Sequence, residues 1–168
     1  METRKQIAAE KKRCNSYNCA QAILHTYADI AGISEDEAMN IAGAFGGGMG
    51  NMEGTCGALV GAGLVLGLVN KDKAAIEREE GKACFDSPER EQARLKAKVK
   101  SMKQMRQIMT KFQERNGATQ CKLLKGIGTN VVLRERLRVG ERSSGTCPLC
   151  VSDAAEFLES QLNESIWK

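Results

Sequence analysis

The stretch TCGALVGAGLVLGL, residues 55–68, decides the fold class of this chain. It is apolar on every side, and the pairs Gly57/Gly61 and Gly63/Gly67 each place two small residues on one helix face. Such a face lets neighbouring helices approach closely, and a helix that is apolar all round belongs inside a protein. We therefore expect a central buried helix, with Thr55 as its N-cap and Cys56 at its first position.

The rest of the composition favours helices packed around that segment. Aromatic residues make up 4% of the 168 residues, and residues that favour strands are sparse. A chain of this length most often forms one domain with its own core. The sequence thus predicts an all-α fold, a single-domain helical bundle over residues 1–168 with about five to seven helices around the central one.

Neither an export signal nor a membrane span is predicted. The N-terminus runs directly into charged, helix-forming sequence, without the apolar core of a signal peptide. The longest charge-free stretch, from Gly54 to Asn70, has 17 residues, whereas a membrane-spanning helix needs ~20. We expect a cytoplasmic protein, and cysteines there more often bind metals or do catalysis than form structural disulfides.

Local signals divide the chain into further helices. Helix-forming sequence extends from Glu2 to Ala31 and is expected to break at Asn15, Ser16 or Asn18. One of these residues is expected to cap a new helix that begins near Cys19. Helical spacing predicts that this helix buries Cys19, Ile23, Tyr27 and Ile30. Gly32 ends that helix, and Ser34 and Glu37 form a capping box for a short helix through Ala44.

The second half of the chain shows longer amphipathic patterns. Asp86-Ser87-Pro88 signals the start of a helix that ends at Gly117, with an expected core stripe of Leu95, Val99, Met102, Met105, Met109 and Phe112. Thr119 is expected to cap a turn that contains Cys121 and buries Leu123 and Leu124, and residues 131–138 read as a short helix or loop. The last helix is expected to open with Cys147 as N-cap before Pro148, and to bury Val151, Ala154, Ala155, Leu158 and Leu162.

Charge and glycine patterns exclude two classes of binding site. Nine basic residues against three acidic ones lie between Pro88 and Asn116, but no aromatics interleave with them for base stacking, so we expect a solvated helix face and no nucleic acid. The glycine-rich loop from Gly43 to Gly50 lacks the lysine of a P-loop and follows no predicted strand, so we do not expect a nucleotide-binding site. Its glycines are expected to let the backbone pass closely beside a site or another helix.

The candidate site consists of cysteines. Cys19, Cys56, Cys121 and Cys147 each stand near a predicted helix start, where unpaired N–H groups favour thiolate over thiol. Cys150 joins them, since Cys147-Pro148-Leu149-Cys150 has the spacing of a disulfide-exchange or metal-ligand pair. Cys14 and Cys84 have no such context. The single histidine, His25, lies roughly 120° around the helix from Cys19, so it is expected to be a surface or satisfied core residue.

These residues also carry a family resemblance. Asn18-Cys19-Ala20-Gln21-Ala22, the run Gly46 to Gly50, Cys56-Gly57-Ala58-Leu59-Val60-Gly61, Cys121-Lys122-Leu123-Leu124, Cys147-Pro148 and Asp153-Ala154-Ala155 follow one another in that order. From Tyr17 to Leu162 the chain resembles the bacterial and archaeal C_GCAxxG_C_C family of redox-active proteins. The resemblance implies a small helical protein whose four family cysteines match Cys19, Cys56, Cys121 and Cys147. Cys150 is an addition to that pattern.

Three functions remain open from the sequence. The leading one is thiol–disulfide or electron-transfer chemistry with an unidentified redox partner protein, in which a helix-start thiolate, with Cys56 favoured, attacks a disulfide. The second is a zinc site or a [2Fe–2S] iron–sulfur cluster held by Cys19, Cys56, Cys121 and Cys147. The third is a helical interaction protein, such as a homodimer, in which the cysteines are buried bystanders.

Overall fold

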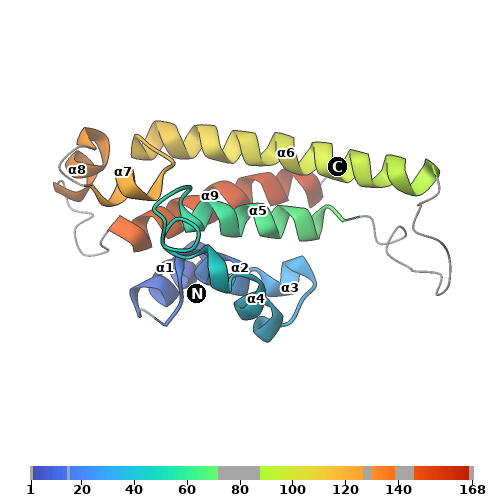
Figure 1. Ribbon diagram of the computed structural model, residues 1–168, viewed down its shortest axis with the longest axis horizontal. Helices are drawn as coiled ribbons and strands as arrows, with labels where there is room; N and C mark the ends of the chain where they lie inside the picture. Colours follow the sequence, from blue (N-terminus) through green and yellow to red (C-terminus); the bar gives the residue numbers. More distant parts are fainter. Residues whose placement is uncertain (1, 15, 72–87, 127–129, 139–145, 167–168) are drawn as a thin grey trace.

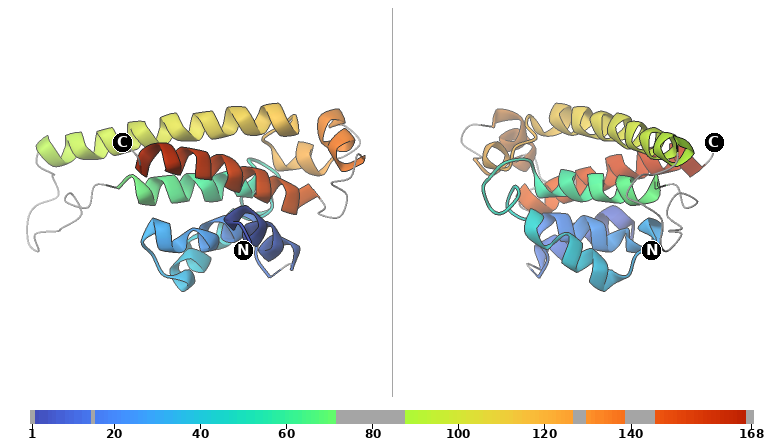
Figure 2. Two further views of the ribbon diagram at one scale, coloured as in Figure 1. Left: turned by 180° about the vertical axis from the view of Figure 1, so that it is seen from behind. Right: turned by 45° about the vertical axis from the view of Figure 1, so that its right-hand side comes forward.

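The computed structural model describes residues 2–14, 16–71, 88–126, 130–138 and 146–166, and these residues form helices in three layers. In Figure 1 the long helix α6 (Pro88–Asn116) lies on top, α5 (Gly57–Val69) and α9 (Thr146–Ile166) lie in the middle, and the N-terminal helices lie beneath. Figure 2 shows the same order from two further directions. Since the described residues contain no β-strand, the prediction of an all-α bundle is confirmed.

The N-terminal layer follows most of its local signals, although the helix predicted from near Cys19 to Gly32 is interrupted at Tyr27 and the helix predicted through Ala44 ends at Ile41. It comprises α1 (Arg4–Arg13), α2 (Cys19–Thr26), α3 (Ala28–Ala31), α4 (Glu35–Ile41) and the 3₁₀ turn η1 (Gly43–Phe45). Asn18 caps α2, because its side chain accepts a hydrogen bond of 2.8 Å from the Gln21 N–H. Gly32 ends α3 with a φ of +69°, and Ser34 opens the predicted capping box of α4. These helices are short, which raises the number of segments above the five to seven expected.

Helix α5 is the buried centre of the bundle, in contact with α2, α3, α6 and α9. The Gly57/Gly61 pair makes the predicted close approach: a Cβ added at Gly61 would lie 2.8 Å from the Ala20 carbonyl oxygen. The same prediction is wrong for Gly63/Gly67. An added Cβ would meet only the Met105 Sδ at 3.6 Å from Gly63, and nothing within 4 Å at Gly67. Close packing is therefore confined to the first half of α5, where α2 crosses it.

Helix α6 departs from the predicted stripe. Ile108 and Phe112 are fully buried, but Leu95, Val99 and Met102 are each 57% exposed. The predicted stripe repeats about every 3.5 residues, whereas a straight α-helix has 3.6 residues per turn, so the stripe moves gradually around the helix. Val99 lies nine residues before Ile108 and therefore on roughly the opposite side of α6. Polar residues take the inner face instead: the Asn70 Nδ2 donates to the Gln104 Oε1 at 2.7 Å, and the Gln104 Nε2 donates to the Gln161 carbonyl at 3.1 Å.

The C-terminal third returns along the bundle to close it. Two short helices, α7 (Cys121–Lys125) and α8 (Val131–Arg138), lie at the end of the bundle where α6 finishes (Figure 1). Leu124 is buried as predicted, whereas Leu123 is 41% exposed, because only one side of α7 faces the core. The predicted apolar face of α9 is confirmed, since Val151, Ala154, Ala155, Leu158 and Leu162 are all buried. None of the described helices is both long and apolar enough to cross a membrane.

Candidate functional site

The first cysteine, Cys19, is fixed by the cap of α2. It is the first residue of the helix, as predicted, and 8% of it is exposed. The Asn18 side chain that caps this helix also donates to the carbonyls of Ala42 and Gly43, at 3.1 and 3.0 Å. The same side chain therefore ties the start of α2 to the beginning of the glycine-rich loop.

The second cysteine, Cys56, is itself the N-cap of α5. Thr55, the predicted cap, instead forms an isolated antiparallel bridge with Gln120. The Cys56 N–H donates to the Thr119 carbonyl at 2.8 Å, and the Cys121 N–H donates to the Gly54 carbonyl at 2.6 Å. The helix therefore starts one residue later than predicted. The same backbone pairing places the segments that carry Cys56 and Cys121 side by side.

The N-cap predicted for the helix of Cys121 was also wrong. Helix α7 begins at Cys121, and its N-cap is Gln120, not Thr119. The glycine-rich loop runs directly against this cysteine. Gly48 has a φ of +79°, and a Cβ added there would lie 2.6 Å from the Cys121 Cβ. Gly57 makes a similar approach to Cys19, with a distance of 3.2 Å from its added Cβ to the Cys19 Cβ. The expectation that the loop passes closely beside a site is thus met at Gly48.

The remaining pair, Cys147 and Cys150, stands on the first turn of α9. This helix begins at Thr146, so Cys147 lies inside it and is not its N-cap. Cys150 is 2% exposed, while Cys147 is half-buried. Because the two cysteines are three positions apart on a helix, both side chains lie on the same side of α9. The starts of α5, α7 and α9 meet at one end of the bundle, beside the glycine-rich loop (Figure 1).

Four of the thiols interact in two pairs, Cys19 with Cys147 and Cys56 with Cys150, and each pair joins α9 to another helix. In the first pair, the Cys19 thiol donates to the Cys147 sulfur, which lowers the pKa of Cys147 to about 6 despite its burial. The same hydrogen bond and burial raise the pKa of Cys19. Each effect has the expected sign, because a hydrogen bond to a charged sulfur stabilises it and the donor must keep its proton.

The second pair repeats this arrangement deeper in the bundle. The Cys150 thiol donates to the Cys56 sulfur and lowers the pKa of Cys56, while the hydrogen bond and burial raise the pKa of Cys150. The backbone N–H groups of Ala58 and Leu59, at the start of α5, also lower the pKa of Cys56. This is the helix-start effect that the sequence predicted for Cys56.

Cys121 takes part in neither pair. Burial raises its pKa, with smaller increases from the charges of Cys56 and Cys147 and a decrease from Lys125. Two lysines that the sequence reading missed, Lys12 and Lys125, also lower the pKa of Cys147. They come from α1 and α7, and nothing in their local sequence marks them as neighbours of a cysteine.

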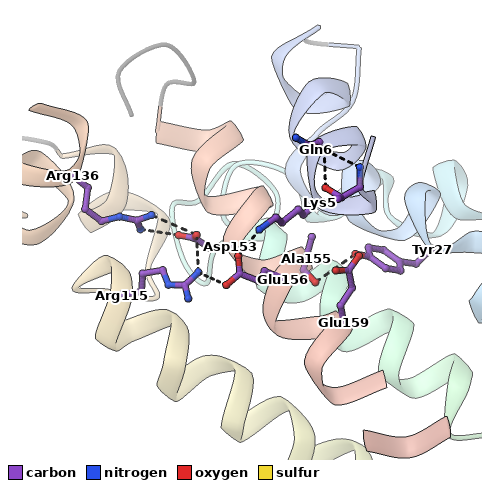
Figure 3. Close-up of polar contacts among 10 residues, drawn as sticks. Lys5, Gln6, Tyr27, Arg115, Arg136, Asp153, Ala155, Glu156 and Glu159 are labelled. Carbon is purple, nitrogen blue, oxygen red and sulfur yellow. Dashed lines mark hydrogen bonds and ion pairs between the residues drawn. The ribbon is translucent and has the colours of Figure 1, made fainter. Parts of the chain in front are cut away.

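An ion-pair network fixes the position of α9 and therefore of its two cysteines. Asp153, one turn after Cys150 and 5% exposed, accepts from Arg136 of α8 at 2.8 Å and from Arg115 of α6 at 3.3 Å (Figure 3). The next carboxylate along, Glu156, accepts from Arg115 at 2.8 Å and from Lys5 of α1 at 2.9 Å. These pairs link α9 to three helices, and sequence reasoning missed them because the partners lie far apart in the chain.

The predicted metal centre does not form in the described part of the chain. The donor set suits zinc or an iron–sulfur cluster, but no three His, Cys, Asp or Glu side chains among the described residues are arranged to hold a metal ion. Of the two cysteines set aside from the sequence, Cys14 is exposed and Cys84 lies outside the described residues. His25 is a partnered side chain, as predicted, with its Nδ1 2.8 Å from the Lys11 Nζ.

Comparison with known proteins identifies the family of this chain. The model of the family described as "Putative redox-active protein (C_GCAxxG_C_C)" matches residues 17–161. The chain belongs to this family. The matched range includes Cys19, Cys56, Cys121 and Cys147, and the match confirms the resemblance found in the sequence. No curated protein and no solved structure matches the chain.

Proposed function

We propose that this protein of the C_GCAxxG_C_C family carries out thiol–disulfide exchange, with Cys147 as the attacking thiolate and Cys19 as the resolving thiol. The proposal rests on the interaction of these two thiols, which lowers the pKa of Cys147 and raises the pKa of Cys19, so that one sulfur is ionised while the other is protonated. Cys147 is also half-buried, whereas Cys56, the attacking residue favoured from the sequence, is only 5% exposed. A substrate disulfide therefore reaches Cys147 more easily.

The exchange proceeds in two steps that balance. The Cys147 thiolate attacks one sulfur of a substrate disulfide, forms a mixed disulfide with it and releases the other half as a thiolate. Cys19 then gives up its proton and attacks the Cys147 sulfur, which closes a Cys19–Cys147 disulfide. The second half of the substrate leaves and takes the proton. The dithiol has lost two electrons and the substrate has gained two; run backwards, the same steps oxidise a substrate dithiol.

The Cys56–Cys150 pair is, in this proposal, a second dithiol behind the first. Both sulfurs are almost fully buried, so a substrate does not reach them directly. Their neighbour on α9 is Cys147, whose charge acts on both Cys56 and Cys150. The Cys56 thiolate can attack Cys147 of a Cys19–Cys147 disulfide and release Cys19, and Cys150 can then close a Cys56–Cys150 disulfide and release Cys147. This exchange passes oxidation inward and restores the outer dithiol.

Counting thiols during oxidation tests the proposal. We expect diamide to remove four of the seven thiols of the wild-type chain, and only two in a Cys150→Ser variant. Peptide mapping without reduction should show the Cys19–Cys147 disulfide in both. The matched control is Cys14→Ser, since Cys14 is exposed and outside both pairs; it should still lose four thiols.

Two outcomes would contradict the proposal. If Cys147→Ser is oxidised as fast as the wild type, Cys147 is not the attacking residue. If protein purified without oxygen holds iron or zinc in a fixed ratio to the chain, the metal-centre alternative replaces the dithiols. The redox partner would then have to be sought among electron carriers instead of thiol proteins.

A further inference from the structure

A cavity of about 590 Å³ opens between α1, α2, α3 and the start of α4. Arg4, Ile7 and Lys11 line it from α1, and none of the cysteines does. Its volume falls within the range typical of small-molecule sites. Neither the proposed thiol chemistry nor the family match gives this cavity a role.

Lys11 and His25 are two of the polar residues that line the cavity, and they contact each other. The Lys11 Nζ lies 2.8 Å from the His25 Nδ1. An ammonium group can only donate, so we infer that Nδ1 accepts and that the imidazole carries its proton on Nε2. The Tyr17 ring packs edge-on against the imidazole, with 5.1 Å between the ring centroids, and holds its orientation. The remaining Lys11 N–H groups and the His25 Nε2–H are thus donors in the lining of the cavity.

The charge of Lys11 has no carboxylate directly against it in the described residues. Burial lowers the pKa of Lys11, the nearby Glu35 raises it and Arg4 lowers it. Glu35 lies 3.6 Å from the far nitrogen of the imidazole, and its side chain is 76% exposed. The other carboxylate of the cavity, Asp29, is held by both terminal nitrogens of Arg4 at 2.8 and 2.7 Å. A partly buried ammonium in this situation favours an anion from outside.

The remaining walls are largely apolar. Ile7, Ala28 and Ile33 also line the cavity, together with the uncharged Thr26 and Ser34, and the Arg4–Asp29 pair adds no net charge. A ligand that fits this lining carries one negative group and a short hydrocarbon chain.

We propose that this cavity binds a small aliphatic carboxylate, with its carboxyl group on the Lys11 Nζ and the His25 Nε2–H and its chain against Ile7, Ala28 and Ile33. Glu35 competes with the ligand for the imidazole and, being exposed, moves into solvent when the ligand binds. The proposal is independent of the thiol chemistry, so either can fail without the other.

The single histidine makes a direct test available, because its ring signals in an NMR spectrum need no assignment. Titrating the full chain with hexanoate should shift the His25 ring signals in a saturable way. Lys11→Met should weaken binding at least ~10-fold through loss of the charge-assisted hydrogen bond. Glu35→Gln should strengthen it, because the competing carboxylate is gone. Lys103→Met, an exposed lysine of α6, removes the same charge elsewhere and should change nothing.

Each other outcome overturns part or all of the proposal. An absence of saturable shifts with hexanoate in the wild type, or the same affinity in Lys11→Met, refutes the site. Equal binding of 1-hexanol refutes the role of the carboxyl group, and equal binding of inorganic phosphate refutes the role of the hydrocarbon chain. If Lys11→Met is not folded by circular dichroism, Glu35→Gln decides: unchanged or weaker binding in that variant refutes the site.

Discussion

The pKa of Cys147 depends on a hydrogen bond from one neighbour, and removing that neighbour should move it in a known direction. The Cys19 thiol donates to the Cys147 sulfur and is the largest influence that holds the pKa of Cys147 at about 6, against an ordinary value of 9.0. In a Cys19→Ala variant the thiolate loses this donor while the burial of Cys147 remains. The pKa of Cys147 should therefore rise by ~1–3 units, because hydrogen bonding favours the charged form only while the donor is present.

The rate of modification at a single pH is a poor readout of this change. At pH 7 a thiol with a pKa of 6 is roughly nine-tenths ionised, and one with a pKa of 9 about one-hundredth. Intrinsic nucleophilicity, however, falls with pKa by a Brønsted factor of about 0.4–0.5, which over three units is a loss of roughly 20–30-fold. The net gain in rate at pH 7 is only about 3–5-fold. The midpoint of the pH profile of modification distinguishes a Cys147 pKa of about 6 from a higher one much better than the rate at pH 7 does.

The assay is iodoacetamide labelling of the reduced protein between pH 4 and pH 10, followed by mass spectrometry of the peptide that contains Cys147. The wild type should show a midpoint at about 6, and Cys19→Ala a midpoint displaced upward. Lys12→Met should displace it in the same direction by less, since Lys12 is a smaller influence. Cys14→Ala, which removes an exposed thiol outside the pairs, is the control. A wild-type midpoint near 9, or the same midpoint in Cys19→Ala, would refute the hydrogen-bonded pair.

Four further substitutions test the packing around the thiols by chemical unfolding. Gly61→Ala should lower the free energy of unfolding by ~1–3 kcal/mol, because its Cβ would lie 2.8 Å from the Ala20 carbonyl oxygen. Gly67→Ala has nothing within 4 Å of its added Cβ and should raise the free energy of unfolding by ~0.5–1 kcal/mol. Equal effects of the two substitutions would contradict the packing of α2 on α5. Gly48→Ala should lower the free energy of unfolding by ~1–3 kcal/mol, because Gly48 has a positive φ and the added Cβ would lie against Cys121. Any gain in stability would be inconsistent with this loop geometry. Asp153→Asn should cost ~1–3 kcal/mol through its two arginine partners, and a neutral result would show that they contribute nothing.

Local signals predicted the fold class and most helix ends because caps act over a few residues. Asn18, Gly32 and Ser34 each fix a backbone conformation with groups in their own segment, so their effect can be read from the sequence. Thr55 failed as a cap for the opposite reason. Its backbone is engaged by Gln120, and a bridge between segments 65 residues apart leaves no trace in either one.

The sequence singled out the cysteines of the candidate site, which stay a prediction, but it did not predict which thiols pair. Helix-start context identified Cys56, and its N-terminal N–H groups do lower its pKa. The partner of each thiol, however, is set by how α9 lies against α2 and α5, which depends on contacts such as the Asp153–Arg136 ion pair. Helix periodicity shows which face of α9 is apolar and carries no information on which residues of other helices meet it.

Pairing by hydrogen bonds has a consequence for the direction of the redox reaction. In the reduced protein, the charge on Cys147 is stabilised by the Cys19 thiol, and the charge on Cys56 by the Cys150 thiol. A disulfide has neither charge nor thiol proton, so oxidation removes both stabilising interactions. Whatever stabilises the reduced state makes the disulfide more oxidising and its low-pKa sulfur a better leaving group. In the proposed thiol chemistry, this favours a protein that, once oxidised, accepts electrons from other thiols, and the same holds for the outer pair and the inner pair.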